Sequence, residues 1–142
     1  MDHVTEHCSS DGLGGIDRVI LVHGFGAGPH DHWFPWLARS IRHVEVPQLP
    51  HPESPDASTW ASTIAERIGT SPDGMAGLAI VTHSLGGLTA LRAIERVIAR
   101  GSPTNGDGRH LAAFIAVAPF AQQLPPTGEA ELDHFLATGL EG

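Results

Sequence analysis

A chain of 142 residues is long enough for one compact domain with a buried core and too short for two ordinary domains. It has 16 acidic residues, 8 arginines and no lysine, which gives a formal net charge of -8. This charge argues against nucleic acid and anionic membranes as partners, since both bind basic patches. No segment approaches the ~18 uninterrupted apolar residues of a membrane span, and Cys8 alone cannot form an internal disulfide. With no recognisable signal peptide, these features predict a soluble cytoplasmic protein.

Residues 1–15 are polar and carry three glycines, so we expect a flexible leader ahead of a single domain over residues 16–142. The ten histidines invite a metal hypothesis. They are scattered, however, and no grouping has the ligand spacing of a zinc site; the nearest are His3, His7 and Cys8, and His30 and His32. We therefore expect neither a metal ion nor another cofactor.

A continuous apolar run at residues 19–22 predicts a strand that is buried on both faces of a parallel sheet. The sequence HGFGAGP follows at residues 23–29. Such a glycine-rich loop lets main-chain N–H groups turn toward a ligand, as in phosphate cradles and oxyanion holes. A nucleotide-binding loop is the weaker interpretation, because the sequence lacks Gly-Lys-Ser/Thr and its glycines do not follow the GxGxxG spacing.

Two helices are predicted on either side of a short strand. Asp31 is the predicted N-cap of the first, whose apolar residues at helical spacing are Trp33, Trp36, Leu37 and Ile41. We expect the two tryptophans in the core or in a pocket wall rather than in a cofactor site. A strand at residues 43–46 and an irregular proline-bearing loop at residues 47–55 follow. Ser58 is then predicted to cap a second amphipathic helix, which carries Trp60, Ile64 and Ile68.

The stretch GLAIVTHSLGGLTALRAI, residues 77–94, predicts a strand, a sharp turn and a helix. Ser84 occupies the turn, and the small residues Gly86 and Gly87 let the helix pack close to neighbouring strands. This is the pattern of a nucleophile elbow, GxSxG, with Thr82 in place of the first glycine. The hydroxyl would lie at a helix N-terminus, where free N–H groups face a developing negative charge. The alternative is an ordinary strand-to-helix turn with Ser84 as an N-cap.

The rest of the chain is predicted to form a polar loop at 102–109, a strand at 111–117, a proline-bearing loop at 119–127 and a short helix at 129–138. Strands and helices thus alternate along the chain, which predicts an α/β fold, a three-layer αβα sandwich with a parallel sheet. Ligands of such sheets bind at the carboxyl ends of the strands. The two glycine-rich turns are therefore expected to face one crevice.

The sequences HGFGAG after the first strand and THSLGG after the third together resemble the corresponding loops of α/β-hydrolases. More specifically, residues 18–132 resemble the small retinoblastoma-binding-protein-9-like serine hydrolases. The shared features are the Trp33-x-x-Trp36 pair, the proline-rich loop after the second strand, Trp60 and the apolar strand at 111–117. The resemblance implies a serine esterase or related acyl hydrolase that acts on a small acyl or ester substrate.

The resemblance also assigns roles to residues at matching motif positions. It implies Ser84 as the nucleophile and an oxyanion hole formed by the backbone N–H groups of Phe25 and Leu85. It places the triad acid and histidine on loops after later strands. This sequence offers only Asp133 and His134 there, adjacent on a short helix where they would point in different directions. We therefore expect the triad acid and base, and the last strands of the sheet, to be missing from this chain.

Two other histidines lie near the predicted site. His83 is expected to point away from the nucleophile, and His23 to shape its own loop. A non-catalytic hydrolase-fold binding or interaction protein is the alternative function. An uncovered apolar edge at residues 111–117 further predicts self-association of the chain.

Overall fold

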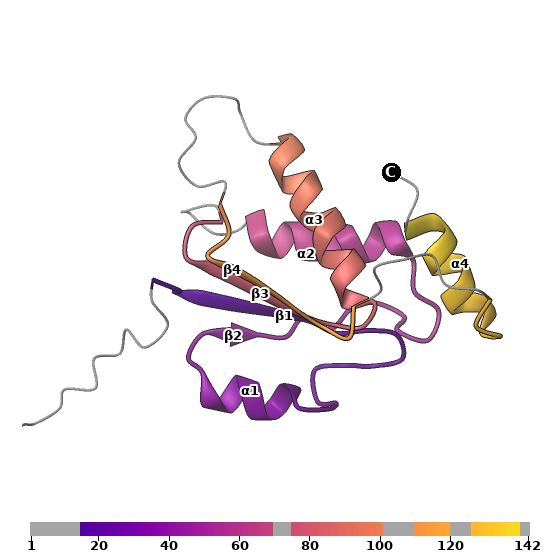
Figure 1. Ribbon diagram of the computed structural model, residues 1–142, viewed down its shortest axis with the longest axis horizontal. Coiled ribbons are helices and arrows are strands. Elements are labelled where there is room, and N and C mark those ends of the chain that lie inside the picture. Colours follow the sequence, from indigo (N-terminus) through magenta and orange to yellow (C-terminus); the bar gives the residue numbers. More distant parts are fainter. Residues whose placement is uncertain (1–14, 70–74, 101–109, 120–125, 140–142) are drawn as a thin grey trace, which may run out of the picture.

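The computed structural model describes residues 15–69, 75–100, 110–119 and 126–139, so the predicted leader lies outside the described residues apart from Gly15. Strands and helices alternate through the described chain (Figure 1). Their order is β1 (Arg18–Val22), α1 (Phe34–Ser40), β2 (Val44–Glu45), α2 (Ala57–Gly69), β3 (Leu78–His83), α3 (Gly86–Arg100), β4 (Ala113–Val117) and α4 (Ala130–Gly139). The predicted α/β alternation is confirmed. No helix in these ranges is long and apolar enough to cross a membrane.

The strands described here form one parallel sheet in the order β2-β1-β3-β4 (Figure 1). β1 pairs with β3 along its whole length, and its last residue, Val22, lies opposite Thr82. β4 continues the sheet beyond β3 and brings Val117 opposite His83. Because parallel strands run the same way, the carboxyl ends of β1, β3 and β4 lie along one edge of the sheet.

Helices cover both faces of the sheet, as a three-layer arrangement requires. α2 and α3 pack together on one face with α4 against α2, and α1 lies on the other face (Figure 1). Alternate strand residues supply the two interfaces. Ile20 and Ile80 pack toward α2 and α3, whereas Leu21 and Val81 pack toward α1. Burial on both faces accounts for the continuous apolar runs in β1 and β3.

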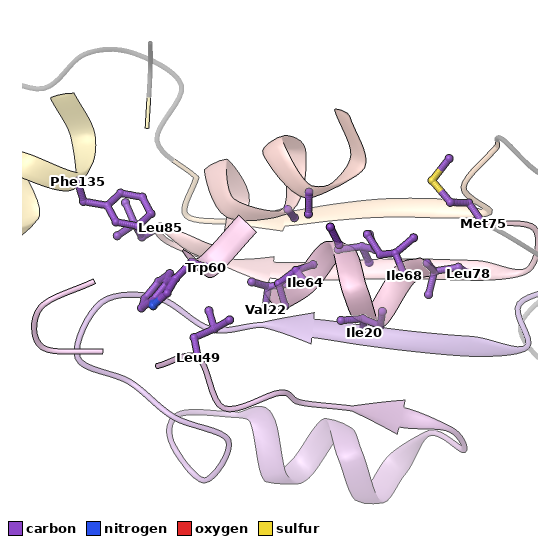
Figure 2. Packing of buried hydrophobic residues seen from close by; sticks show 14 of the residues in the cluster. Ile20, Val22, Leu49, Trp60, Ile64, Ile68, Met75, Leu78, Leu85 and Phe135 are labelled. Carbon is purple, nitrogen blue, oxygen red and sulfur yellow. The ribbon is translucent and has the colours of Figure 1, made fainter. Parts of the chain in front are cut away.

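The larger of the two cores lies between the sheet and α2 (Figure 2). Trp60, Ile64 and Ile68 recur at helical spacing on α2 and are fully buried, so the predicted apolar face of this helix is confirmed. Trp60 contacts Phe135 of α4 edge to face, with ring centroids 5.4 Å apart. This aromatic pair closes the end of the core near the carboxyl ends of the strands (Figure 2).

The predicted start of the first helix is wrong. α1 begins at Phe34 with Trp33 in the N-cap position, and the Asp31 carboxylate accepts a hydrogen bond from the Gly28 N–H over 2.7 Å instead of capping the helix. Phe34 is fully buried and Trp33 packs against the same cluster as predicted, whereas Trp36 is 62% exposed and lies outside the core. At 100° per residue, Trp36 points about 200° away from Phe34, which faces the sheet.

The predicted cap of the second helix is also wrong. α2 begins at Ala57, and the Asp56 carboxylate accepts a hydrogen bond from the Thr59 N–H over 2.7 Å, so Asp56 is the N-cap. Hydrogen bonds from Thr59 hold the pKa of Asp56 below its usual range. Ser58 instead accepts from the Arg96 guanidinium, through its carbonyl at 2.7 Å and its hydroxyl at 3.1 Å.

Other predicted boundaries shift by one or two residues. His43 has a φ of 59°, in the left-handed region, so the strand predicted at 43–46 is reduced to Val44–Glu45. The strand predicted at 111–117 begins at Ala113, and the helix predicted at 129–138 occupies Ala130–Gly139. These shifts leave the order of elements unchanged.

We expect Asp56→Ala to lower the free energy of unfolding by about 1 kcal/mol, because the Thr59 N–H would lose its acceptor at the start of α2. Ser58→Ala is the matched control and should cost less than about 0.5 kcal/mol, since the Ser58 carbonyl still accepts from Arg96. Urea unfolding of both variants measures the difference. A larger loss in Ser58→Ala would restore Ser58 as the cap.

Candidate active site

Ser84 lies at the corner between β3 and α3 and has a φ of 53°. This left-handed conformation costs a residue with a side chain roughly 1–2 kcal/mol. Hydrogen bonds on both sides maintain it: the Ser84 N–H donates to the Val117 carbonyl over 2.9 Å, and the Gly87 N–H donates to the Ser84 carbonyl over 3.1 Å. Because α3 begins at Gly86, the residue in its N-cap position is Leu85. The alternative of Ser84 as the N-cap is therefore wrong.

The two glycines after Ser84 differ in how much space surrounds them. A Cβ added at Gly86 would overlap the Val22 carbonyl oxygen and lie 2.8 Å from that of His23, at the end of β1. A Cβ added at Gly87 would meet nothing nearer than the Thr82 hydroxyl oxygen at 3.5 Å, an ordinary contact. Only Gly86 is therefore required for the close approach of α3 to the sheet.

The glycine-rich loop after β1 lies directly against the Ser84 corner. A Cβ added at Gly24 would lie 3.0 Å from the Ser84 Cβ, 3.1 Å from the His83 carbonyl oxygen and 3.4 Å from the Leu85 nitrogen. Since β1 and β3 are neighbouring parallel strands, their outgoing loops meet at the carboxyl edge of the sheet. The structure thus places Gly24, which precedes Phe25, against Ser84 and Leu85.

The backbone donors of this loop fall into two groups. The Gly26 N–H donates to the Pro52 carbonyl over 2.8 Å, and the Ala27 N–H donates to the Gly24 carbonyl over 3.3 Å. The N–H groups of Phe25 and Leu85 make no backbone hydrogen bond within the part of the chain that the structure describes. These two N–H groups are the donors that the sequence analysis assigned to an oxyanion hole. The Leu85 side chain is fully buried near Phe135 (Figure 2), which fixes the position of its N–H.

His23 ties this loop to the loop after β2. Its Nε2 accepts a hydrogen bond from the Leu49 N–H over 3.0 Å, so the ring proton lies on Nδ1, which donates to the Gly24 carbonyl over 2.9 Å. The ring is fully buried, and this burial holds its pKa below the ordinary value. The sequence indicated a loop-shaping role for His23 but not its partner Leu49, which no local pattern marks.

Trp60 also contacts the loop after β2, at residues 47–55. Its indole N–H donates to the Pro50 carbonyl over 2.7 Å, and its ring contacts His23 edge to face at 5.6 Å. The Ser54 hydroxyl donates to the Glu131 carboxylate over 2.9 Å and so connects the loop to α4. Segments far apart in the sequence therefore meet at the loop that spans residues 47–55.

The remaining candidate histidines lie away from the Ser84 hydroxyl. The His83 ring contacts His32 and Phe34 on the α1 side, with centroids 4.8 Å and 5.7 Å away, and burial together with the charge of His32 lowers its pKa. The charge of His134 acts on Asp56 at the start of α2.

Asp133, the neighbour of His134 on α4, is also occupied elsewhere. Its carboxylate accepts from the Thr127 N–H and hydroxyl over 2.8 Å and 2.7 Å, and these bonds lower its pKa. Among the described residues, no histidine or carboxylate side chain forms a hydrogen bond with Ser84. The ranges described also contain no cluster of three side chains that could hold a metal ion.

A cavity of about 430 Å³ lies elsewhere, at the junction of α2, α3 and α4. Its walls are polar and charged side chains of both signs, including Asp56, Ser58, Arg92, Glu95 and Arg96. None of its lining residues belongs to the glycine-rich loop or to the Ser84 corner. The cavity therefore does not form part of the candidate active site.

Comparisons with known proteins agree with this geometry. A family model described as serine hydrolase matches residues 19–139. The chain belongs to the serine hydrolase family. YdeN of Bacillus subtilis (strain 168), by name a hydrolase, is 29% identical to this chain over 112 residues, which cover 76% of this chain and 53% of YdeN. The chain thus spans about half the length of this curated relative.

A solved structure also matches this chain in fold. The crystal structure of the ydeN gene product from B. subtilis matches this chain with a TM-score of 0.63 and 28% sequence identity. The match covers 84% of this chain and 59% of that one. The α/β fold with a parallel sheet flanked by helices is therefore shared with a hydrolase-like structure.

We expect Gly86→Ala to lower the free energy of unfolding by about 2–3 kcal/mol, because the added methyl group would overlap the Val22 carbonyl and push α3 away from β1. Gly87→Ala is the matched control on the same helix, and its effect should stay within about 1 kcal/mol. Urea unfolding followed by tryptophan fluorescence measures both variants. Equal losses would contradict the packing argument.

Lowering the pH should weaken the hydrogen-bonded link between His23 and Leu49. Burial lowers the folded-state pKa of His23, so below the ordinary value of about 6.5 the unfolded chain binds a proton that the folded chain does not. The free energy of unfolding should therefore decrease as the pH falls from about 7.5 to about 5.5, by at most ~1.4 kcal/mol per pH unit for this group.

Unfolding curves of the wild type and His23→Asn separate the contribution of His23 to the pH dependence of stability from that of His83, whose pKa is also lowered. The variant should be less stable near neutral pH and should lose stability less steeply on acidification. Hydrogen exchange of the Leu49 amide, which donates to the His23 ring, gives a local readout. Identical slopes in the two proteins would rule out the proposed role of His23 protonation.

Proposed function

We propose that this serine hydrolase acts on carboxylic esters or related small acyl compounds, with Ser84 as the nucleophile. The observation that carries the proposal is the left-handed corner at Ser84, set directly against the glycine-rich loop at residues 23–29. A serine in such a corner lies at the carboxyl edge of the sheet, where ligands of parallel sheets bind. Membership of the serine hydrolase family supports the same chemistry.

In the proposed reaction, Ser84 Oγ attacks the acyl carbon and the carbonyl π electrons move onto oxygen. The N–H groups of Phe25 and Leu85 would donate hydrogen bonds to this oxyanion, and the N-terminus of α3 would add its partial positive charge. A preorganised donor of this kind typically contributes 10²–10³ in rate, on the order of 3 kcal/mol. Collapse of the intermediate then breaks the bond to the leaving group, and water hydrolyses the acyl-Ser84 ester.

We propose that the triad acid and base are missing from this chain, so the proton that Ser84 Oγ loses on attack would pass to solvent water, and water would protonate the leaving group. The proposal is supported by the positions of His83 and His134, neither of which hydrogen-bonds Ser84 in the described structure. An unassisted hydroxyl is a weak nucleophile near neutral pH, and loss of the base costs a serine triad on the order of 10⁶ in kcat. Turnover by this chain should therefore reach only ~10³ to 10⁴ above the reaction in water.

Two finer assignments belong to this proposal. We place the chain near the retinoblastoma-binding-protein-9-like serine hydrolases, because two features of that resemblance, Trp60 and the proline-bearing loop, contact each other through the Pro50 carbonyl. We also propose a cytoplasmic location, which rests on the single cysteine, Cys8.

A non-catalytic hydrolase-fold binding protein is the second candidate. The observation that favours it is the missing hydrogen bond between Ser84 and any basic side chain of the described residues. In that case the N–H groups of Phe25 and Leu85 would bind a carboxylate or carbonyl ligand without chemistry. The two functions differ in whether Ser84 reacts.

Labelling with a fluorophosphonate probe, followed by peptide mass spectrometry, separates them. We expect slow labelling at Ser84 that disappears in Ser84→Ala and persists in Ser40→Ala, a matched change of an exposed serine at the end of α1. Added imidazole can serve as an external base, so it should accelerate labelling of Ser84. Hydrolysis of p-nitrophenyl esters should be barely above background and should fall to background in Ser84→Ala.

The other outcomes are equally informative. No labelling at Ser84, even with imidazole, would favour the binding protein. Rapid labelling that is lost in His134→Ala would overturn the missing base and make this chain a complete hydrolase.

A further inference from the structure

His23 connects two loops through both nitrogens of one ring. Its Nε2 accepts a hydrogen bond from the Leu49 N–H over 3.0 Å, and its Nδ1–H donates to the Gly24 carbonyl over 2.9 Å. Because a backbone N–H can only donate, the contact with Leu49 requires a bare Nε2 and places the ring proton on Nδ1. Only this tautomer can donate to Gly24.

The Gly24 carbonyl and the Phe25 N–H belong to the same peptide group. A peptide group is planar, and none in the described chain is cis, so this carbonyl and this N–H point in opposite directions. A bond that fixes the direction of the carbonyl therefore fixes the direction of the N–H as well. The Ala27 N–H donates to the same carbonyl over 3.3 Å, which leaves the peptide group less freedom to rotate.

The His23 ring is held firmly in its own place. It is fully buried, and the Trp60 ring contacts it edge to face with centroids 5.6 Å apart. Trp60 is also fully buried and donates its indole N–H to the Pro50 carbonyl over 2.7 Å. A second link joins the two loops, since the Gly26 N–H donates to the Pro52 carbonyl over 2.8 Å. The loop after β2 is therefore a fixed frame for the His23 ring.

The surroundings of the ring favour its neutral form. Among the described residues, the Asp31 carboxylate is the charged group that acts on His23, and it raises the pKa of the ring less than burial lowers it. The titratable side chains of the loop after β2, His51 and Glu53, are exposed. Near neutral pH the ring therefore keeps the bare Nε2 that the Leu49 N–H requires.

We propose that His23 is a positioning residue for the oxyanion hole: through the Gly24 carbonyl it aims the Phe25 N–H at the oxygen of the reacting acyl group. This inference rests on the proposed function, in which the Phe25 N–H donates to the oxyanion. Hydrogen bonds in a chain polarise one another, so the bond that His23 receives and the bond that it gives both strengthen this donor. A donor held in place before the reaction needs no reorganisation when the negative charge develops.

Two substitutions separate the two hydrogen bonds of the ring. In His23→Asn the amide nitrogen is bonded to Cγ, as Nδ1 is, so it can still donate to the Gly24 carbonyl. In His23→Gln the amide lies one bond farther out, as Nε2 does, so it keeps an acceptor for the Leu49 N–H and loses the donor to Gly24. A positioning role predicts that His23→Asn reacts faster. A purely structural role predicts the opposite order, since the shorter Asn leaves the larger cavity.

Fluorophosphonate labelling of Ser84 in the full chain tests this order, with the maximal rate and the half-saturating probe concentration determined separately. Imidazole is left out, because it fits the space that the substituted ring leaves. The maximal rate should fall about 10–100-fold in His23→Gln and less than about 5-fold in His23→Asn. The half-saturating concentration should stay unchanged, because only the charged transition state needs the donor.

His30→Asn is the matched control, since it changes an exposed histidine just after the glycine-rich loop, and it should label like the wild type. Circular dichroism melting checks that the three variants fold.

NMR gives a spectroscopic readout of the same arrangement. The ring nitrogens of His23 should show the proton on Nδ1 in the unlabelled protein. In the labelled protein the phosphoryl oxygen stands in for the oxyanion, so the Phe25 amide proton should move to lower field in the wild type and in His23→Asn. In His23→Gln this shift should be less than about half as large, because the peptide group is no longer held.

The remaining outcomes distinguish the two proposals. Equal maximal rates in His23→Asn and His23→Gln, or a change confined to the half-saturating concentration, would overturn the positioning role and leave the proposed function intact. A ring proton on Nε2, or a loss in His30→Asn as large as in His23→Gln, would do the same. A wild type that never labels at Ser84 would overturn both.

Discussion

The close contact between the start of α3 and the end of β1 is the constraint on which the rest of the site depends. Gly86 has no room for a side chain against the carbonyls of Val22 and His23, so the helix packs closer to the sheet than any other residue would allow. This approach holds Ser84 in its left-handed corner and brings Gly24 against it. Corner and loop are therefore one packing unit, and a shift of α3 would move Ser84 away from Gly24.

Buried polar groups connect this unit to the loop at residues 47–55. His23 is fully buried but has both ring nitrogens hydrogen-bonded, which avoids the cost of an unsatisfied polar group in the core. The indole of Trp60 is satisfied in the same way by the Pro50 carbonyl. Because the bonds to Leu49 and Pro50 join the end of β1 and the start of α2 to the loop at residues 47–55, an irregular segment with several prolines acquires a fixed position.

Local sequence patterns failed where two assignments satisfied the same local rule. Asp56 and Ser58 both have side chains that cap helices well. The choice between them depends on where α2 meets α3, because Arg96 of α3 hydrogen-bonds Ser58 and leaves Asp56 to cap α2. The spacing of the tryptophans fits more than one helical phase. The buried position of Phe34 decides the phase of α1 and leaves Trp36 in solvent.

The sequence by itself determined the alternation of strands and helices, the parallel sheet and the sharp corner at Ser84, because hydrophobic period, segment length and glycine spacing are local properties of the chain. Only the tertiary structure decided which partners meet there. The Leu49 N–H reaches His23, and the N–H groups of Phe25 and Leu85 lack backbone acceptors in the described chain, through contacts between segments that the sequence separates. Such contacts depend on how whole elements pack, and no local pattern encodes that packing.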